Sequence, residues 1–185
     1  MTTRAGMGNI ISRLRRMVND GSASAWNDNE LQEILDRHRV DIWEQQLAGI
    51  EMTQNGTALF TTYLAGWKDL EEAGSGTAAW RLFAANGTAL GTADWTADYI
   101  NGIVTFNVDQ AGSARYLDCR SYDLAGAAAQ TWREAAGAKA SYYTFNVDGQ
   151  NLSRSDWFKH CMQMADYYDT KTRPVRVSMV RDDLN

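Results

Sequence analysis

Tyr122 to Leu184 has the sequence YDLAGAAAQTWREAAGAKASYYTFNVDGQNLSRSDWFKHCMQMADYYDTKTRPVRVSMVRDDL. Residues 122–143 place apolar side chains three and four positions apart, which predicts a helix rich in alanine and glycine that another helix can approach closely. Asp148-Gly149 has the chemistry of a turn. Ser153 opens a pattern similar to a capping box, which predicts the start of a second helix. Arg173-Pro174 ends this second helix, because the residue before a proline avoids the α-region.

Residues 172–185 follow these helices as an extended tail, which we expect to dock on a partner. Apolar residues in the tail alternate with polar and charged ones, so an extended strand has one apolar side. Such a strand can add to a sheet edge of another protein, and its arginines can pair with carboxylates there. The residues expected to bind the partner are Arg173, Val175, Arg176, Val177, Met179 and Arg181. A frayed terminus is the alternative interpretation.

The first 49 residues predict a pair of helices. Residues 4–19 carry an apolar stripe at helical spacing, made of Met7, Ile10, Ile11, Leu14, Met17 and Val18. A second helix is expected over residues 27–47, because Asn27 and Asp28 are both good N-caps. Its stripe consists of Leu31, Ile34, Leu35, His38 and Ile42.

Residues 50–118 have a different pattern, which predicts a small β-module. Residues 59–64, 80–83 and 103–106 are rich in β-branched and aromatic side chains, and Asn86-Gly87 is a hairpin signal. The aromatic residues of the module are Trp67, Trp80, Trp95, Tyr99 and Phe106. They indicate a core or subunit contacts, with a carbohydrate-binding platform as the alternative.

The sequence therefore predicts an α+β chain that is mainly a helical bundle. Two N-terminal and two C-terminal helices form the bundle, a small β-module is inserted between them, and an extended C-terminal tail follows. The expected boundaries are 1–49 for the first helix pair, 50–118 for the β-module, 119–171 for the second helix pair and 172–185 for the docking tail.

Composition limits the classes of partner. The 185 residues carry a net charge of −5, while residues 171–181 hold four basic side chains and no acidic one. An acidic body with a short basic tail is a poor non-specific DNA binder. The N-terminal residues lack the apolar segment of a signal peptide, and no run approaches the roughly 20 apolar residues of a membrane span. We therefore expect synthesis in a cytoplasm.

No pattern of residues predicts a catalytic, cofactor or metal site. Cys119 and Cys161 are too few for a disulfide framework and have no zinc spacing, so buried free thiols are expected. His38 and His160 lack ligands or acid–base partners at a supporting spacing. The carboxylates of Asp36, Asp41, Glu44, Asp166 and Asp169 are interpreted as solvated helix faces rather than a hydrolase pair. The chain is therefore not expected to be an enzyme.

The order of these segments resembles the head–tail connector proteins, or adaptors, of long-tailed bacteriophages. The likeness rests at the start on residues 26–31 (WNDNEL) and 35–39 (LDRHR). At the end it rests on residues 122–125 (YDLA), 127–129 (AAA), 148–150 (DGQ), 152–155 (LSRS) and 179–184 (MVRDDL). The middle β-region is similar only in type, and it is larger than in the minimal helical adaptors.

The resemblance implies a non-enzymatic structural protein of the virion neck, with no cofactor. Its subunits would form a ring, typically a dodecamer, between the portal protein and the stopper or tail-completion proteins. The ring would extend the channel through which genomic DNA passes with weak contact during packaging and ejection. In such proteins the C-terminal segment commonly reaches the portal. A tail-associated module that binds carbohydrate or a receptor is the alternative function, motivated by the tryptophan-rich β-region.

Overall fold

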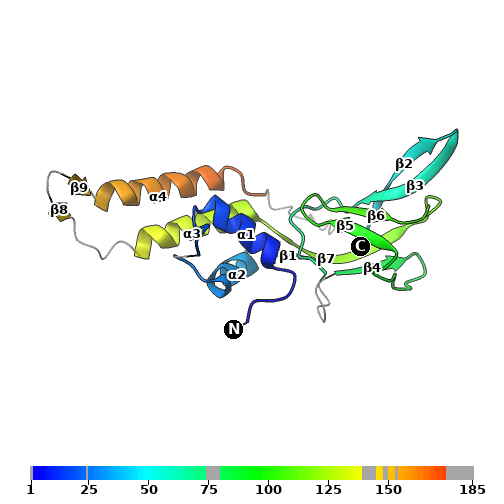
Figure 1. Cartoon of the computed structure of the whole chain (residues 1–185), viewed down its shortest axis with the longest axis horizontal. Coiled ribbons are helices and arrows are strands. Elements are labelled where there is room, and N and C mark those ends of the chain that lie inside the picture. The colour runs from blue at the N-terminus through cyan, green and yellow to red at the C-terminus, as the bar shows by residue number, and fades with distance from the viewer. Residues whose placement is uncertain are drawn as a thin grey trace, which may run out of the picture.

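The computed structural model of the chain describes residues 2–23, 25–73, 80–138, 145–147, 150–152 and 154–173. The described part is elongated, with four helices toward one end and two β-sheets toward the other (Figure 1). The helices are α1 (Gly8–Met17), α2 (Asp28–Arg37), α3 (Leu124–Ala138) and α4 (Arg154–Asp169). The strands of the two sheets are β1 (Arg39–Gln46), β2 (Ala48–Gln54), β3 (Thr57–Leu64), β4 (Trp80–Ala84), β5 (Trp95–Asp98), β6 (Ile103–Phe106) and β7 (Arg115–Tyr122).

The helical end is built on the apolar stripes that the sequence predicts. The stripes of α1 and α2 meet the alanine-rich face of α3 and two residues of α4. The buried residues of this core are Met7, Ile10, Ile11, Leu14, Val18, Leu31, Ile34, Leu35, Tyr122, Leu124, Ala127, Ala128, Trp132, Ala136, Cys161 and Ala165. Asn27 caps α2 as predicted, since its side chain accepts from Glu30 N (2.9 Å) and Glu30 returns a bond to Asn27 N (2.7 Å).

A buried arginine fixes the turn between α1 and α2. Arg15 donates to the carboxylates of Asp20 and Asp28, each at 2.7 Å. Asp20 also accepts from the backbone N–H groups of Ala25 and Trp26. The polar residues after α1 therefore end the helix and hold the start of α2 in place.

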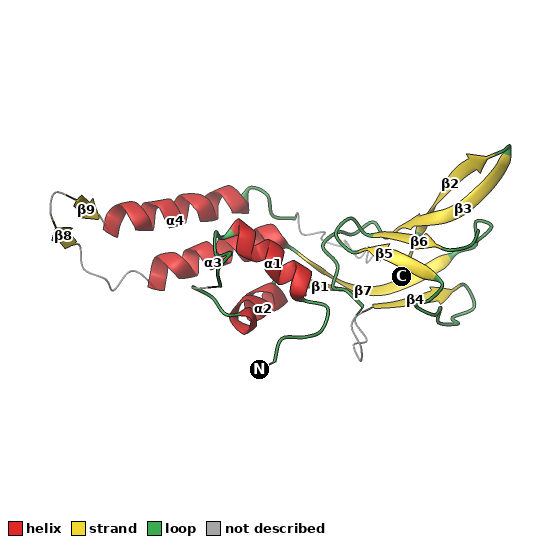
Figure 2. Ribbon diagram, viewed as in Figure 1, coloured by secondary structure: helices red, strands yellow, loops and turns green. Residues whose placement is uncertain are grey.

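The β end consists of two antiparallel sheets with strand orders β1–β7–β4 and β2–β3–β6–β5. Residues from both sheets form one apolar core, distinct from the helical one. Its buried members are Ile42, Leu47, Tyr63, Ala65, Leu70, Trp80, Leu82, Trp95, Val104, Phe106, Leu117 and Cys119. Two further short strands, β8 (Phe145–Val147) and β9 (Gln150–Leu152), pair with each other beyond the start of α4 (Figure 2).

The expectation of a mainly helical bundle is wrong. The described residues contain about as much strand as helix, and seven antiparallel strands form two sheets. The second helix does not continue to Leu47: α2 ends at Arg37, and Arg39–Gln46 is β1. His38 and Ile42 misled the sequence reasoning because a spacing of four fits both the helical period and the alternation of a strand. β1 pairs with β7, which joins Arg39 to Tyr122, and such a distant partner leaves no local signal.

The alanine-rich helix begins at Leu124 rather than Tyr122, and its close packing is confirmed. α3 ends at Ala138, and the residues to Tyr143 lie outside the described part, as do Asp148-Gly149 and Ser153. Ala127, Ala128 and Ala129 are fully buried. A Cβ added at Gly126 would lie 2.7 Å from His38 Nδ1, so this glycine is required by the contact with His38. A Cβ at Gly137 would meet nothing within 4 Å.

Replacement of Ala129 by leucine should overpack the buried face of α3. We expect Ala129→Leu to lower the free energy of unfolding by about 1–3 kcal/mol, measured by urea denaturation. Gly137→Ala is the matched control on the same helix, because it adds a methyl group in open space and should stabilise by about 0.5–1 kcal/mol. Equal stability of Ala129→Leu and the parent protein would contradict the packing of this face.

Candidate functional site

The most heavily charged buried region lies where the helical and β ends join. Tyr122 is the last residue of β7, and only Asp123 separates it from the start of α3. The segment after β3 crosses this joint, since Glu71 N donates to Arg120 O (2.9 Å) and Glu72 N donates to Gly6 O (3.2 Å). Three parts of the chain that are far apart in sequence therefore meet at one place.

A carboxylate with no solvent exposure lies at the centre of the joint. Glu71 is 0% exposed and its Oε2 accepts from the Tyr122 hydroxyl at 2.6 Å. Arg4 Nη2 donates to the same hydroxyl at 2.9 Å, and Arg4 Nε lies 3.4 Å from Glu71 Oε1. Arg4 also holds Asp36 through two bonds of 2.6 Å each. A buried charge is tolerated only when it is paired and hydrogen-bonded, and this arrangement supplies both.

Further ion pairs extend this network to β1. Arg120 Nη1 lies 3.6 Å from Glu71 Oε2, and Arg120 Nε lies 3.4 Å from Asp41 Oδ1. Arg39 Nε is 3.1 Å from the same Asp41 oxygen. The network thus alternates cations and anions, and its carboxylates are engaged by arginines rather than presented to a substrate.

The pKa values of the network agree with a structural role. The pKa of Tyr122 is raised well above its usual value, mainly because the phenol is buried and also because its hydroxyl bonds to Glu71. The pKa of Arg4 is raised by its bonds to Asp36. The Arg4 guanidinium and the Tyr122 phenol therefore both keep their protons at neutral pH.

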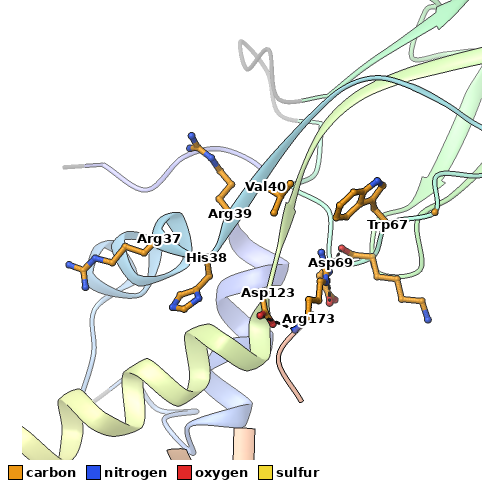
Figure 3. A pocket seen from close by; sticks show the side chains of 10 residues that line it. Arg37, His38, Arg39, Val40, Trp67, Asp69, Asp123 and Arg173 are labelled. Carbon is orange, nitrogen blue, oxygen red and sulfur yellow. Dashed lines mark hydrogen bonds and ion pairs between the residues drawn. The ribbon is translucent and has the colours of Figure 1, made fainter. Parts of the chain in front are cut away.

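A pocket of about 680 Å³ opens on the other side of the same joint (Figure 3). It is lined by Arg37, His38, Arg39, Val40, Gly66, Trp67, Lys68, Asp69, Asp123 and Arg173. Residues on β7 alternate between faces, so Tyr122 faces the charged network while Ser121 faces this pocket side. The Ser121 hydroxyl donates to Lys68 O at 2.7 Å and accepts from Arg173 Nη1 at 2.6 Å.

Arg173, the first of the predicted docking residues, lies in this pocket. Its backbone N–H donates to Asp123 Oδ2 (3.2 Å), and its Nη2 donates to Lys68 O (2.8 Å) and lies 3.6 Å from Asp69 Oδ2. The chain after α4 is therefore fixed to the joint at Arg173. The other predicted docking residues, Val175, Arg176, Val177, Met179 and Arg181, lie outside the described residues.

The aromatic residues of the β-module occupy the core rather than a binding platform. Trp80, Trp95 and Phe106 are buried, and Trp67 and Tyr99 pack against the same cluster partly buried. The ring centroids of Trp80 and Trp95 lie 5.9 Å apart, and Trp80 meets Tyr99 edge-on at 4.9 Å. The preference for a core role is confirmed for the three buried rings.

The other candidate reactive groups have structural partners. His38 directly follows α2, and its Nε2 lies 2.9 Å from Gln130 Oε1. The interpretation of Asp41 and Glu44 as part of a helix face is wrong, because both lie on β1, and Asp36 and Asp41 belong to the charged network. Both cysteines are buried free thiols, as predicted. Burial, with a contribution from Asp118, raises the pKa of Cys119 to about 12. A thiol with this pKa is almost wholly protonated near pH 7, so it is a poor nucleophile.

Within the described residues no three metal-ligating side chains come together, and no helix there is long and apolar enough to cross a membrane. Comparison of the chain with protein-family models, curated proteins and solved structures found no match. Sequence reasoning missed Arg4, Glu71 and Arg120, because the partners of Arg4 and Glu71 in this network lie 32 to 118 positions away in the sequence.

Removal of the Arg4 guanidinium should destabilise the joint strongly. We expect Arg4→Met, which keeps an unbranched side chain but removes the guanidinium, to lower the free energy of unfolding by about 3 kcal/mol, because it leaves Glu71 short of a cation in a buried site. Arg37→Met is the control: the Arg37–Glu134 pair is exposed and should be worth less than about 1 kcal/mol. Equal losses in the two variants, measured by urea denaturation, would contradict a special role for the buried network.

The raised pKa of Tyr122 predicts a loss of stability in alkali. Above about pH 10 the unfolded chain releases the phenol proton that the folded chain keeps, so unfolding becomes more favourable as pH rises. Tyr122→Phe lacks this proton and should show a smaller decline in the free energy of unfolding between about pH 9 and pH 11. The buried thiol of Cys119 acts in the same direction in both proteins. Identical pH profiles would show that Tyr122 is not held protonated.

Proposed function

We propose that this protein is a non-enzymatic subunit of a head–tail connector ring. Its ring would lie between the portal and the stopper or tail-completion proteins of a bacteriophage. The resemblance of the helical segments at both ends of the sequence to such adaptors motivates the proposal. The observation that carries it is the rigid charged joint, which fixes a helical end, a β end and the origin of the C-terminal tail relative to one another.

A connector subunit needs such rigidity because it receives a platform on one side and neighbours on others. Glu71, with no solvent exposure, is paired within the joint and not aimed at a cavity. The described residues bring together no metal-ligating cluster, and burial keeps the Cys119 thiol protonated by raising its pKa. These features support a scaffold, and they give no support to a hydrolase.

The position of Arg173 supports the tail as the portal-docking arm. Because this residue is held by Ser121, Lys68 and Asp123, the segment 174–185 starts from a fixed point on the body. A short tail that starts from a fixed point loses less conformational freedom on binding than a tail that starts from a mobile segment. Apolar and polar residues alternate along the tail, and this pattern suits its addition to a sheet edge of the portal.

Deletion of residues 174–185 should abolish binding to the portal and leave the body folded. We expect the deleted protein to keep the melting temperature of the parent within a few degrees, because Arg173 and its partners remain. Portal binding is measured by co-sedimentation and by electron microscopy of rings. A second variant tests the pattern of the tail. In it, residues 175–180 are reordered so that the alternation is removed while composition and charge stay the same, and it should also lose portal binding. Full portal binding by either variant would refute the docking role of the tail.

The isolated protein should be monomeric or weakly associated and should form rings on the portal. Like charges on an acidic body repel at low salt, so the platform must bring the subunits together. Sedimentation analysis with and without the portal measures this. Stable dimers with no affinity for the portal would contradict the connector proposal.

A further inference from the structure

The hairpin formed by β2 and β3 extends beyond the sheet that carries it (Figure 1). β3 pairs with β6 only through Thr62, Tyr63 and Leu64, whereas residues 57–61 have β2 as their only strand partner among the described residues. All seven residues of β2 are exposed. A two-stranded hairpin by itself is marginally stable in water. The outer part of this hairpin therefore gains from a contact outside its own chain.

The direction of the hairpin is nevertheless fixed at its middle. Phe60 N donates to the Asp109 carboxylate at 2.7 Å, and Gln110 N donates to Phe60 O at 3.0 Å. A Cβ added at Gly112 would meet the Phe60 ring at 3.4 Å, so the loop that follows β6 lies against this side chain. The hairpin is thus a braced arm whose outer half is free to contact another molecule.

The arm has a simple chemical pattern. Among residues 48–64 the only charged side chain is Glu51. Its neighbours Ile50 and Met52 are 37% and 45% exposed, which is high for such side chains. Edge strands of monomeric proteins are commonly protected by several charges or a proline, whereas this edge has one carboxylate and a register shift between Ile50 and Met52. The pattern fits a surface that offers an apolar wall and a cation.

The pocket at the joint is such a surface. Val40, 41% exposed, and Trp67 supply apolar walls. Its two acidic residues, Asp69 and Asp123, are both engaged by Arg173. Lys68 is exposed and forms no ion pair with any other described residue. The pocket therefore has a cation available for a carboxylate beside apolar groups.

The arm cannot enter the pocket of its own chain. Ala48 pairs with Leu64 at the base of the hairpin, and Gln54 pairs with Thr57 at its tip. Four of the residues that line the pocket, 66–69, follow the base of the hairpin after a single residue. The arm runs from this base away from the helical end of the molecule (Figure 2). Only the pocket of another molecule can receive it.

We propose that the β2–β3 arm of one copy docks in the joint pocket of a second copy. The edge strand β2 then enters the pocket, with Glu51 on one of its faces paired with Lys68, and Ile50 and Met52 on the other face against Val40 and Trp67. The chain as a whole is acidic, so copies repel each other except where a nearly uncharged arm meets a cationic pocket. Because arm and pocket are different surfaces, the contact is heterologous, and its repetition gives a closed ring or an open chain.

This contact would supply the lateral contacts of the proposed ring, but it is tested without the portal. Sedimentation equilibrium of the full chain, at low salt and up to the solubility limit, should show a mass that rises with concentration. Glu51→Lys and Lys68→Glu should each weaken the association about tenfold or more, because each places like charges in contact. Both side chains are exposed, so the melting temperatures should not change. Glu33→Lys, an exposed reversal on α2 outside both surfaces, is the matched control and should leave association unchanged.

Mixing the two variants tests the pairing itself. In an equimolar mixture of Glu51→Lys and Lys68→Glu, every contact between unlike chains joins a glutamate to a lysine, so association should return to the parent level. A parent protein that stays monomeric at the solubility limit would overturn the proposal. So would a mixture that stays dissociated, or an association that responds to Glu51→Lys and not to Lys68→Glu, since the arm would then dock elsewhere. Portal binding by the tail-deleted protein is measured separately from self-association through the β2–β3 arm. Failure of the proposed arm–pocket contact can therefore be distinguished from failure of the connector proposal.

Discussion

The need to neutralise one buried carboxylate organises this molecule. Glu71 has no contact with solvent, and in a medium of low polarity its charge requires close hydrogen bonds and cations. Tyr122, Arg4 and Arg120 supply them from a strand end, from the N-terminal segment and from the middle of β7. None of these partners can be placed without the others. A buried ionic network of this type is weak support for net stability, but it tolerates few alternative arrangements of the elements that carry it.

The end of β7 serves both parts of the structure because its side chains alternate. Tyr122 belongs to the helical core and to the charged network, while Ser121, one residue earlier, binds Lys68 O and Arg173. Cys119 lies in the β core two residues before that. A single strand thus links two separate apolar cores, a charged network and a pocket, so a small shift of β7 would disturb all four. This shared strand ties the helical end and the β end together at the joint.

The sequence predicted those elements whose signals are local. The stripes of α1 and α2, the cap at Asn27 and the burial of the α3 alanines depend on neighbours within a few residues, and the structure confirms them. The strand over residues 103–106 was also found. β1 was missed because its apolar spacing fits two periods and its partner lies about 80 residues later. The network was missed for a related reason: single arginines and glutamates have no periodic signal, and their pairing appears only after the sheets form.

The contacts within this chain differ in kind from those proposed with other molecules. Inside the joint, several charged groups are fixed by multiple bonds, so their geometry is set before any partner arrives. On the arm, the residues of β2 are all exposed, and the outer half of the hairpin has only its own two strands paired with each other. A contact that orders a segment is weak between two free molecules, because binding must offset the lost conformational freedom. On a platform that already holds the subunits side by side, that cost falls, since the second binding event becomes effectively intramolecular. A rigid joint combined with a marginal arm therefore suits a subunit that stays dispersed until a partner assembles it.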